Sequence, residues 1–467
     1  MIPFDAATAA RWTGARLARG DATRRFEAVS IDTRSLPPGS LFVAIRGPRH
    51  DAHAFLADAL RAGAAGLLVE REDAVPADAP DALPVLVVED GTRALGELAT
   101  GHREGFDGPV VAITGSNGKT TTKEMCAAIL GGVAPCLRNR GNLNNAYGLP
   151  LTLLERDAAH RAVVVEMGMN HRGEIAPLAA IARPDVGVLT NVGTAHIEFL
   201  GSREEIAREK GDLLAALPPD GVAVVNGDDP LACAQARRSP ARVLRFGLGP
   251  EADVRAERVT PLGDRGHAFD LLAPPGRVPV HVAGLGETAV PNALAAAGAA
   301  LAAGATLEQV AEGLARYEPA PGRMQRVTLP RNVILINDTY NANPQSVEVA
   351  LRSLASLKGG SRGIAVLGDM GELGEDAVGA HRAAGALAAE LGLDFLFVLG
   401  RHAKDVAEGA LGAGMEPARV HVGGDHEETG AAVSRVLQGD DWVLVKGSRS
   451  MRMERVVDAV ARRAEGA

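Results

Sequence analysis

The stretch Val110-Val111-Ala112-Ile113-Thr114-Gly115-Ser116-Asn117-Gly118-Lys119-Thr120 decides the fold. Its first four residues are apolar and lie between Pro109 and a turn, which predicts a buried strand of a parallel sheet. The residues that follow, 120–130, predict a helix. A strand, a Gly-rich turn and a helix in this order favour an anion site, because backbone N–H groups and the helix N-terminus point at the ligand.

The turn departs from the usual phosphate loop in its spacing. The pattern Gly-x-x-x-x-Gly-Lys-Ser/Thr would need glycine where this chain has Ile113, so the loop is shorter and its first glycine is Gly115. Lysine at this place reaches the β- and γ-phosphates of a nucleotide, and a threonine hydroxyl binds Mg²⁺. We therefore predict an ATP site formed by Gly115, Ser116, Asn117, Gly118, Lys119, Thr120 and Thr121.

Strand and helix patterns alternate along the chain and divide it into three α/β units. Residues 1–106 form a small unit, with strands expected at 41–45, 67–69 and 84–88 and a helix at 54–62. Residues 107–318 predict a central doubly wound, P-loop ATPase-like domain, with strands at 110–113, 162–165, 186–189 and 222–225 and helices at 120–130 and 203–217. A breaker-rich linker at 317–322 leads into residues 319–467, a Rossmann-like domain with strands expected at 333–336, 364–367, 395–399 and 442–445.

Composition excludes several functional classes. The 467-residue chain has a net charge of -9, so nothing favours nucleic acid or an anionic membrane. Its three cysteines show no metal-ligand or paired spacing, which fits a reducing compartment. We find no leader-like N-terminus and no run of about 18 apolar residues, and the Ala-rich residues 293–305 predict a buried helix instead. We therefore expect a soluble cytoplasmic protein without a membrane span.

Three isolated residues are candidates for catalysis. Glu166 ends the apolar run 162–165 and His196 follows the run 186–189, so both are expected at the carboxyl edge of the sheet, where ligands bind. A carboxylate there suits Mg²⁺, but a solvated loop carboxylate and a structural histidine are the ordinary alternatives. Lys210 lies on the predicted helix 203–217, and spacing alone favours a surface lysine.

A polar loop follows the predicted helix 120–130. It reads Arg140-Gly141-Asn142-Leu143-Asn144-Asn145-Ala146-Tyr147-Gly148, and this density of amides among glycines indicates a bound polar ligand. A structured Asn-Gly turn is the alternative. We retain Asn142, Asn144 and Asn145 as candidate binding residues.

Together these segments resemble the Mur ligase family over nearly the whole chain. The series comprises the short loop 114–121, Gly141-Asn142 to Asn145, Glu166-Met167-Gly168, Thr194-Ala195-His196-Ile197-Glu198, Glu209-Lys210-Gly211, Gly322-Arg323, Asp338-Thr339-Tyr340-Asn341-Ala342-Asn343-Pro344, Leu367-Gly368-Asp369-Met370-Gly371-Glu372-Leu373-Gly374 and Lys446-Gly447-Ser448-Arg449. Each motif alone is weak, whereas the whole series in this order is highly specific.

The resemblance implies an ATP-dependent ligase that activates a carboxylate as an acyl phosphate. It implies two Mg²⁺ ions, with Thr120 and Glu166 holding one and His196 helping to hold the other. Lys210 matches the family lysine that becomes carbamylated, which would turn a cation into an anionic oxygen ligand suited to Mg²⁺. Around ATP, the resemblance assigns the adenine to Asn292, the phosphates to Arg323 and the ribose to Asp338.

Within the family, the chain is most similar to the members that add the terminal dipeptide. The segment Ser30-Ile31-Asp32-Thr33-Arg34 to Ala44 resembles a uridine-binding domain, and its candidate contacts are Ser30, Asp32, Thr33 and Arg34. The resemblance implies UDP-N-acetylmuramoyl-tripeptide, D-alanyl-D-alanine and ATP as substrates, for a monomeric enzyme of peptidoglycan precursor synthesis. The segments Tyr340 to Pro344 and Leu367 to Met370 together favour the dipeptide-adding type. Tyr340 and Asn341 are candidate substrate contacts, and Lys446 and Arg449 are candidates for the dipeptide carboxylate.

Two departures and two alternatives remain open. Gly286-Glu287-Thr288-Ala289 replaces the family's Gly-x-His-Asn before Asn292, and Asn337 stands where an aspartate often precedes Asp338. A third-residue-adding or polyglutamate-type ligase is one alternative. The Asp-x-Pro-Arg motif expected for a diaminopimelate ligase is missing from the sequence, and a uridine-binding segment argues against the polyglutamate type. The other alternative is a nucleotide-binding regulator without catalysis.

Overall fold

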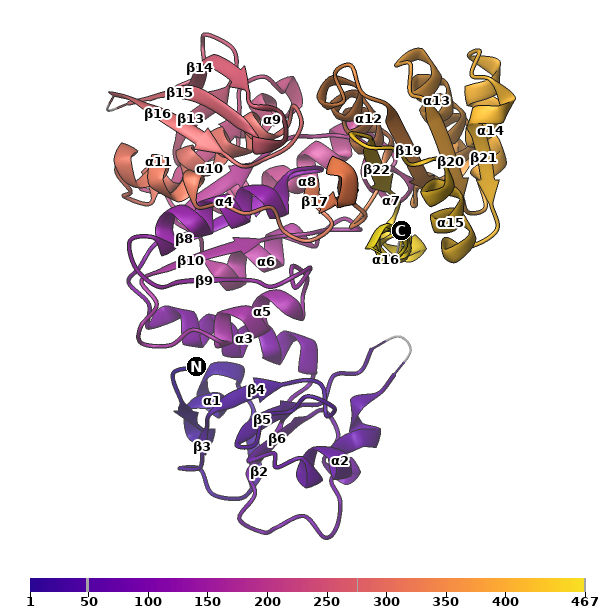
Figure 1. Cartoon of the computed structure of the whole chain (residues 1–467). Coiled ribbons are helices and arrows are strands. Elements are labelled where there is room, and N and C mark those ends of the chain that lie inside the picture. Colours follow the sequence, from indigo (N-terminus) through magenta and orange to yellow (C-terminus); the bar gives the residue numbers. More distant parts are fainter. Residues whose placement is uncertain (48–49, 275, 466–467) are drawn as a thin grey trace.

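Three large β-sheets follow one another along the chain in this computed structural model, which describes residues 1–47, 50–274 and 276–465. Each sheet falls inside one of the three segments predicted from sequence, so the three-part α/β architecture is confirmed. Figure 1 shows the N-terminal sheet at the bottom, the central sheet above it and the C-terminal sheet at the upper right.

The N-terminal sheet has five strands, and all its neighbouring pairs except β2–β7 are parallel. The predicted helix at 54–62 begins as a 3-10 turn, Ala52–Phe55, and becomes α-helical at Leu56. In spatial order the strands are β2 (Arg16–Arg19), β7 (Val85–Val87), β6 (Gly66–Val69), β5 (Ser40–Val43) and β4 (Ala28–Ser30), with β1 (Phe4–Asp5) and β3 (Arg25–Phe26) paired beside them and helices α1 (Ala6–Thr13), α2 (Leu56–Arg61) and α3 (Gly91–Glu104).

The central sheet has nine strands, and its predicted parallel part is present. In spatial order these are β16 (Gly276–Val282), β15 (His267–Ala273), β14 (Val254–Pro261), β13 (Arg242–Gly247), β12 (Val222–Asn226), β11 (Val186–Leu189), β8 (Val110–Thr114), β10 (Ala162–Glu166) and β9 (Cys136–Arg138). The helices are α4 (Lys119–Gly131), α5 (Gly148–Leu154), α6 (Ile175–Ala182), α7 (Ile197–Leu200), α8 (Arg203–Ala215), α9 (Pro230–Ala236), α10 (Ala289–Ala302) and α11 (Leu307–Ala315).

Strands β13 to β16 were not predicted from the sequence. β14 pairs with β15, and β15 with β16, in antiparallel fashion, so the sheet is mixed rather than purely parallel. Much of β14 and β16 is exposed and carries charged side chains, so neither strand shows the apolar run that marks a buried strand.

Alternation along β8 explains how the central layers form, because successive side chains point to opposite faces. Val111 and Ile113 join the apolar cluster of α4 and α10, whereas Val110 and Ala112 join the cluster of α3, α5 and α6. The second cluster also contains Phe4, Phe26 and Leu41 of the N-terminal sheet. The N-terminal and central domains therefore share one continuous apolar core.

The C-terminal sheet has six strands, parallel except for the β17–β18 pair. Its apolar clusters are separate from those of the other domains, apart from Leu285. In spatial order the strands are β17 (Gln325–Leu329), β18 (Val333–Asp338), β22 (Trp442–Lys446), β19 (Gly363–Gly368), β20 (Phe395–Leu399) and β21 (Val420–Gly423), with helices α12 (Pro344–Leu357), α13 (Ala377–Glu390), α14 (Ala403–Gly412), α15 (His426–Val436) and α16 (Glu454–Glu465).

The ends of the predicted domains, at 106/107 and 318/319, remain a proposal, since helix α3 packs against both α1 and the central helices α5 and α6. Across the ranges that the structure describes, no helix combines the length and apolarity needed to span a bilayer.

Candidate active site

One large cavity, of about 1070 Å³, lies between the central and C-terminal domains. It brings together most of the side chains that the sequence singled out, from both domains. Those that line it are Ser116, Asn117, Gly118, Lys119, Thr120, Thr121, Asn142, Asn144, Asn145, Glu166, His196, Asn292, Arg323, Asp338, Tyr340, Asn341, Lys446 and Arg449.

The two glycines of the phosphate loop allow close packing that a side chain would prevent. Gly115 has φ 151°, and a Cβ atom there would lie 1.8 Å from the Thr190 hydroxyl. Gly118 has φ 81°, and a Cβ atom there would lie 2.3 Å from Oδ1 of Asn292. The shortened loop therefore packs directly against Thr190, the residue after β11, and against α10, which places the predicted adenine-contacting Asn292 beside the loop.

Lys119, the first residue of α4, folds back over this loop. Its ammonium group donates to the carbonyl oxygens of Gly115, at 2.7 Å, and Ser116, at 3.4 Å. Burial lowers its pKa, the Glu166 carboxylate opposes that change, and the Arg323 guanidinium adds to it. Two cations beside one carboxylate form a locally positive site in an acidic protein, as expected for a site that binds polyphosphate.

Glu166 is buried at the carboxyl end of β10 with both carboxylate oxygens in use. Oε2 accepts from the Thr120 hydroxyl at 2.8 Å, and Oε1 accepts from the Asn144 side-chain amide at 2.6 Å. The Thr120 hydroxyl in turn accepts from Nη2 of Arg323 at 3.0 Å. The structure thus brings together a hydroxyl, a carboxylate and the asparagine loop that the sequence placed far apart.

Asn139 holds the backbone of Glu166, and Lys123 in turn holds Asn139. Neither residue was singled out from the sequence. The side chain of Asn139 accepts from the Glu166 backbone N–H at 3.0 Å and donates to the Leu143 carbonyl at 2.9 Å. The Asn139 carbonyl accepts from the buried Lys123 ammonium at 2.6 Å. No sequence motif identifies these contacts, because they join the ends of strands β9 and β10 to each other and to helix α4.

Lys210 is not a surface lysine. It is 1% exposed, and its ammonium group makes no hydrogen bond or ion pair with any residue that the structure describes. Burial lowers its pKa well below the ordinary value of 10.5, Lys119 lowers it further, and Glu209 opposes the change. A buried lysine without a partner is costly as a cation, so the site favours a neutral amine or a modified, anionic form.

His196 lies at the start of α7 with a left-handed backbone, φ 65°. Its Nδ1 atom is 2.6 Å from Oε2 of Glu372, which belongs to the C-terminal domain. The two atoms are in direct polar contact, although the contact lacks regular hydrogen-bond alignment. Contact with His196 lowers the pKa of Glu372, while burial opposes this. The sequence analysis quoted Glu372 within a motif but gave it no role.

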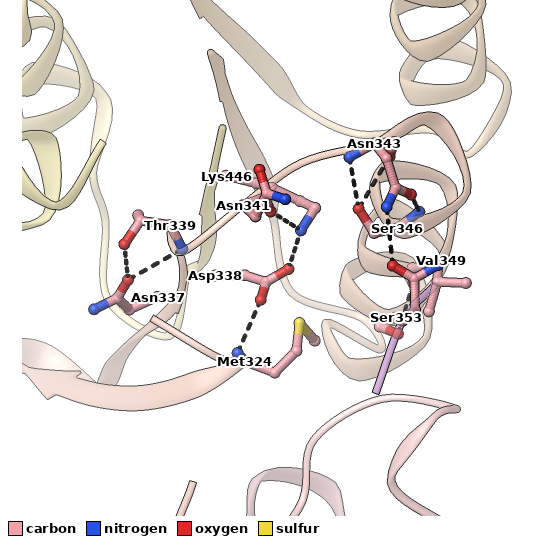
Figure 2. Close-up of polar contacts among 11 residues, drawn as sticks. Met324, Asn337, Asp338, Thr339, Asn341, Asn343, Ser346, Val349, Ser353 and Lys446 are labelled. Atoms are coloured by element: carbon pink, nitrogen blue, oxygen red, sulfur yellow. Dashed lines mark hydrogen bonds and ion pairs between the residues drawn. The ribbon is translucent and has the colours of Figure 1, made fainter. Parts of the chain in front are cut away.

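The C-terminal domain contributes a polar cluster around Asp338, at the end of β18 (Figure 2). One Asp338 oxygen accepts from the Met324 backbone N–H at 3.1 Å, and the other pairs with the Lys446 ammonium at 2.5 Å. Lys446 also donates to the Asn341 carbonyl at 2.9 Å. Lys446 and Asp338, assigned to different ligands by the resemblance, therefore contact each other directly.

Arg323 and Arg449 are the two arginines that the C-terminal domain contributes to the cavity. The Arg323 guanidinium stacks over the Tyr340 ring, with 3.7 Å from Cζ to the ring centroid, which fixes its orientation towards Thr120. Arg449 is largely exposed and pairs with Glu454 at 3.0 Å. Arg323 is thus held at the phosphate loop, while Arg449 lies at the rim of the cavity.

Side-chain amides also connect the phosphate loop to the C-terminal domain. Asn117 accepts from the side chain of Asn343 at 3.0 Å and donates to the side chain of Gln345 at 3.1 Å. Its own backbone carbonyl accepts from the side chains of Thr190 and Asn191. Asn117 therefore uses its side chain for a domain contact in this arrangement. Gln345, which follows the quoted motif, was missed.

The predicted uridine-binding residues lie in the N-terminal domain, away from this cavity. The Ser30 hydroxyl donates to the Asp32 carbonyl at 3.1 Å, and Asp32 pairs with Arg34 at 2.6 Å. The Arg34 hydrogen bonds lower the pKa of Asp32 to about 2. Residues Ser30 to Arg34 thus form a preorganised charged turn after β4. The uridine-binding role of Ser30, Asp32, Thr33 and Arg34 stays a prediction.

The cavity contains oxygen donors of the kind that bind a hard cation. Within the described ranges, no group of three or more His, Cys, Asp or Glu side chains forms a ready-made metal cluster. However, Thr120 and Glu166 place hydroxyl and carboxylate oxygens 2.8 Å apart, and oxygen donors are what Mg²⁺ prefers. Because Mg²⁺ keeps several waters and binds substrate phosphates, two protein oxygens beside a phosphate loop suffice for one ion.

Fold and cavity define a three-domain α/β nucleotide-binding protein with a phosphate loop at a domain interface. Three family descriptions match in order: "Mur ligase family, catalytic domain" at residues 25–103, "Mur ligase middle domain" at 113–300 and "Mur ligase, glutamate ligase domain" at 322–449. The chain belongs to the Mur ligase family, which confirms the resemblance seen in the sequence.

Individual relatives match over nearly the full length. The UDP-N-acetylmuramoyl-tripeptide–D-alanyl-D-alanine ligase of Escherichia coli K12 is 38% identical over 443 residues, which cover 93% of both chains. A crystal structure of MurF from Acinetobacter baumannii aligns with a TM-score of 0.89 at 34% identity, covering 98% of this chain and 99% of that one. The structure of MurF ligase from Thermotoga maritima in complex with ADP aligns with a TM-score of 0.82 at 29% identity, covering 94% and 98%.

Proposed function

We propose that the protein is an ATP-dependent peptide ligase that joins D-alanyl-D-alanine to the C-terminal carboxylate of UDP-N-acetylmuramoyl-tripeptide, in peptidoglycan precursor synthesis. One observation carries the proposal. The cavity unites a phosphate loop and a buried carboxylate with cations of a second domain. The full-length similarity to ligases of this name supports it.

ATP is assigned to the cavity at the phosphate loop. A relative with a TM-score of 0.82 was solved in complex with ADP, which supports nucleotide binding here. We propose that Lys119 and Arg323 contact the phosphates, Asn292 the adenine and Asp338 the ribose. Asn292 lies against Gly118, while both oxygens of Asp338 already have protein partners, so binding of the ribose requires Asp338 to exchange one of them.

Two Mg²⁺ ions and a carbamate complete the proposal. Thr120 and Glu166 would hold one ion, and His196 with carbamylated Lys210 would help to hold the other. These cations would neutralise charge that develops on the transferring phosphoryl oxygens. The buried, unpaired state of Lys210 supports its carbamylation, since a neutral amine attacks CO₂ and an ammonium does not.

The reaction proceeds in two displacements. A terminal carboxylate oxygen of the tripeptide bonds to the γ-phosphorus of ATP as the bond to ADP breaks, giving an acyl phosphate. The dipeptide amine then attacks the acyl carbon, and the tetrahedral intermediate expels inorganic phosphate. Lys119 and Arg323 stabilise the phosphoryl charge, and the remaining rate enhancement comes from positioning.

Substrate positioning is divided among the domains. We propose that Ser30, Asp32, Thr33 and Arg34 bind the uridine end of the nucleotide. Asn142, Asn144 and Asn145 then guide its peptide towards Glu166, and Tyr340, Asn341, Lys446 and Arg449 receive the dipeptide. The Asn144 side chain donates to the Glu166 carboxylate, so this loop lies next to Glu166. Cytoplasmic localisation and a monomeric state stay predictions.

A substrate assay tests the proposed function. Phosphate release should require ATP, UDP-N-acetylmuramoyl-tripeptide and D-alanyl-D-alanine together, because the acyl phosphate is consumed only by the correct amine. Phosphate release with UDP-N-acetylmuramoyl-dipeptide and free lysine or diaminopimelate tests the third-residue alternative. No release with D-alanyl-D-alanine would reject the main assignment. The regulator alternative predicts ATP binding without acyl phosphate, and no feature of the cavity favours it.

Domain closure gives a second test. The central and C-terminal domains meet in the site through side-chain amides and the His196–Glu372 contact, whereas the N-terminal and central domains share an apolar core. We therefore expect motion about the linker at residues 317–322, with closure on substrate binding. Small-angle scattering should show a smaller radius of gyration once an ATP analogue and nucleotide substrate are added. An identical curve with and without these ligands would contradict closure.

A further inference from the structure

The contact between His196 and Glu372 crosses the domain interface inside the cavity. Nδ1 of His196 lies 2.6 Å from Oε2 of Glu372, and both residues line the site. Both also have left-handed backbones, with φ 65° and φ 62°, which side-chain-bearing residues seldom adopt. No regularly aligned hydrogen bond reaches this buried Nδ1 atom from the residues that the structure describes, and the Glu372 carboxylate oxygen that lies against it is an acceptor for its proton.

The loop that carries Glu372 is held firmly. The buried His381 ring accepts from the Met370 backbone N–H at Nε2, at 2.9 Å, and its Nδ1 contacts the Ala377 carbonyl at 2.6 Å. The Asp369 carboxylate accepts from the backbone N–H groups of Arg401 and His402. Glu372 therefore moves with the C-terminal domain as a unit, and it reaches His196 only when that domain is docked.

An imidazole has two nitrogens, and a hydrogen bond to one sets the state of the other. A carboxylate that accepts from Nδ1–H leaves Nε2 with a lone pair, the form that binds a metal ion. Metal-binding histidines usually donate their second N–H to a carboxylate or a carbonyl, which fixes the tautomer and the ring orientation. Glu372 is placed to be this acceptor for His196.

We propose that Glu372 is a positioning residue that fixes His196 as the Nδ1–H tautomer and turns Nε2 towards the second cation site. The inference rests on the proposed function for the role of His196. It adds that the second cation site is complete only when the C-terminal domain is docked, which links cation binding to closure. Glu372 acts through His196 and does not itself bind the cation.

Binding of Mn²⁺ to the full-length protein with ADP tests the proposal, with electron paramagnetic resonance as the readout. Glu372→Ala should weaken the second Mn²⁺ by about 10- to 100-fold, the range for losing such a partner. Glu372→Gln keeps an oxygen acceptor and should stay within about threefold of wild type, since an amide oxygen also accepts from N–H. Glu375→Ala, an exposed carboxylate of the same loop, is the matched control and should not change binding.

Nitrogen-15 NMR of the metal-free protein gives an independent readout. The His196 signals, assigned through His196→Gln, should show the Nδ1–H tautomer in wild type and Glu372→Gln but not in Glu372→Ala. Unchanged Mn²⁺ binding in Glu372→Ala, or an Nε2–H tautomer in wild type, would overturn the proposal. Equal weakening in Glu372→Gln and Glu372→Ala would also overturn it, because it would make Glu372 a direct ligand. Neither readout uses turnover, so failure of the dipeptide assay remains distinguishable.

Discussion

Lys210→Ala is expected to abolish ligase turnover while leaving the fold intact. The loss should be about a thousandfold or more, since removing a cation's anionic ligand forfeits several kcal/mol of transition-state stabilisation, at 1.36 kcal/mol per decade. The ammonium group has no hydrogen-bond or ion-pair partner within the described chain, so its removal breaks no polar contact. Phosphate release and thermal unfolding, measured on the same preparation, separate the two effects.

Rescue by a small anion distinguishes a ligand role from a structural one. Acetate or formate fits the space left by the Lys210 side chain and supplies carboxylate oxygens, so it should restore part of the activity of Lys210→Ala. Lys210→Arg is the matched control, because its guanidinium fills the space and cannot form a carbamate, so it should stay inactive with or without the anion. Wild-type-like turnover of Lys210→Ala without an added anion would rule out the ligand role.

Carbamylation of Lys210 should increase as the pH rises. Burial, and then the neighbouring Lys119, lower the pKa of Lys210 below 10.5. Below the lowered pKa the ammonium cannot attack CO₂, and above it the neutral amine can, so the carbamate fraction should rise with pH through that window. Carbon-13 NMR of protein equilibrated with labelled bicarbonate should show a carbamate signal that grows in this direction and is missing in Lys210→Ala.

Much of the central fold could be predicted from the sequence because buried parallel strands are continuous apolar runs. β11 and β20 have the predicted bounds, and β8 extends one residue further, to Thr114. β14 and β16 could not be predicted in this way, since most of each strand is exposed or half-buried and polar or charged residues interrupt their apolar ones. Apolar periodicity identifies strands that are buried, so it misses strands that remain largely exposed.

The residues of the candidate site also differ in how far the sequence could predict them. Glu166 and His196 could be placed from the sequence because they follow apolar strands, and the carboxyl ends of such strands meet at one edge. The burial of Lys210 was implied only by the family resemblance, since helix spacing favours an exposed lysine. Contacts such as Asn117–Gln345 depend on how two domains dock, which no local pattern encodes.

Lys119→Ala is expected to have the second largest effect, a fall in kcat of about 10²- to 10³-fold, as for the loss of one donor to a developing oxyanion. The ammonium group lies over the loop at Gly115 and Ser116, next to the Glu166 carboxylate and the Arg323 guanidinium. Charge on the phosphoryl oxygens grows in the transition state, so kcat should fall more than KM for ATP rises. Lys404→Ala removes an exposed lysine and should leave both unchanged.

A double-mutant cycle with Arg323→Ala shows whether the two cations act on the same phosphate. Arg323 reaches the loop through the Thr120 hydroxyl and is oriented by the Tyr340 ring, so it and Lys119 approach the ligand from different domains. If both stabilise one phosphoryl group, the double variant should lose less than the product of the single losses, because either loss already impairs the same transition state. Multiplicative losses would mean that the cations act independently, and a wild-type kcat in Lys119→Ala would remove this lysine from the chemical step.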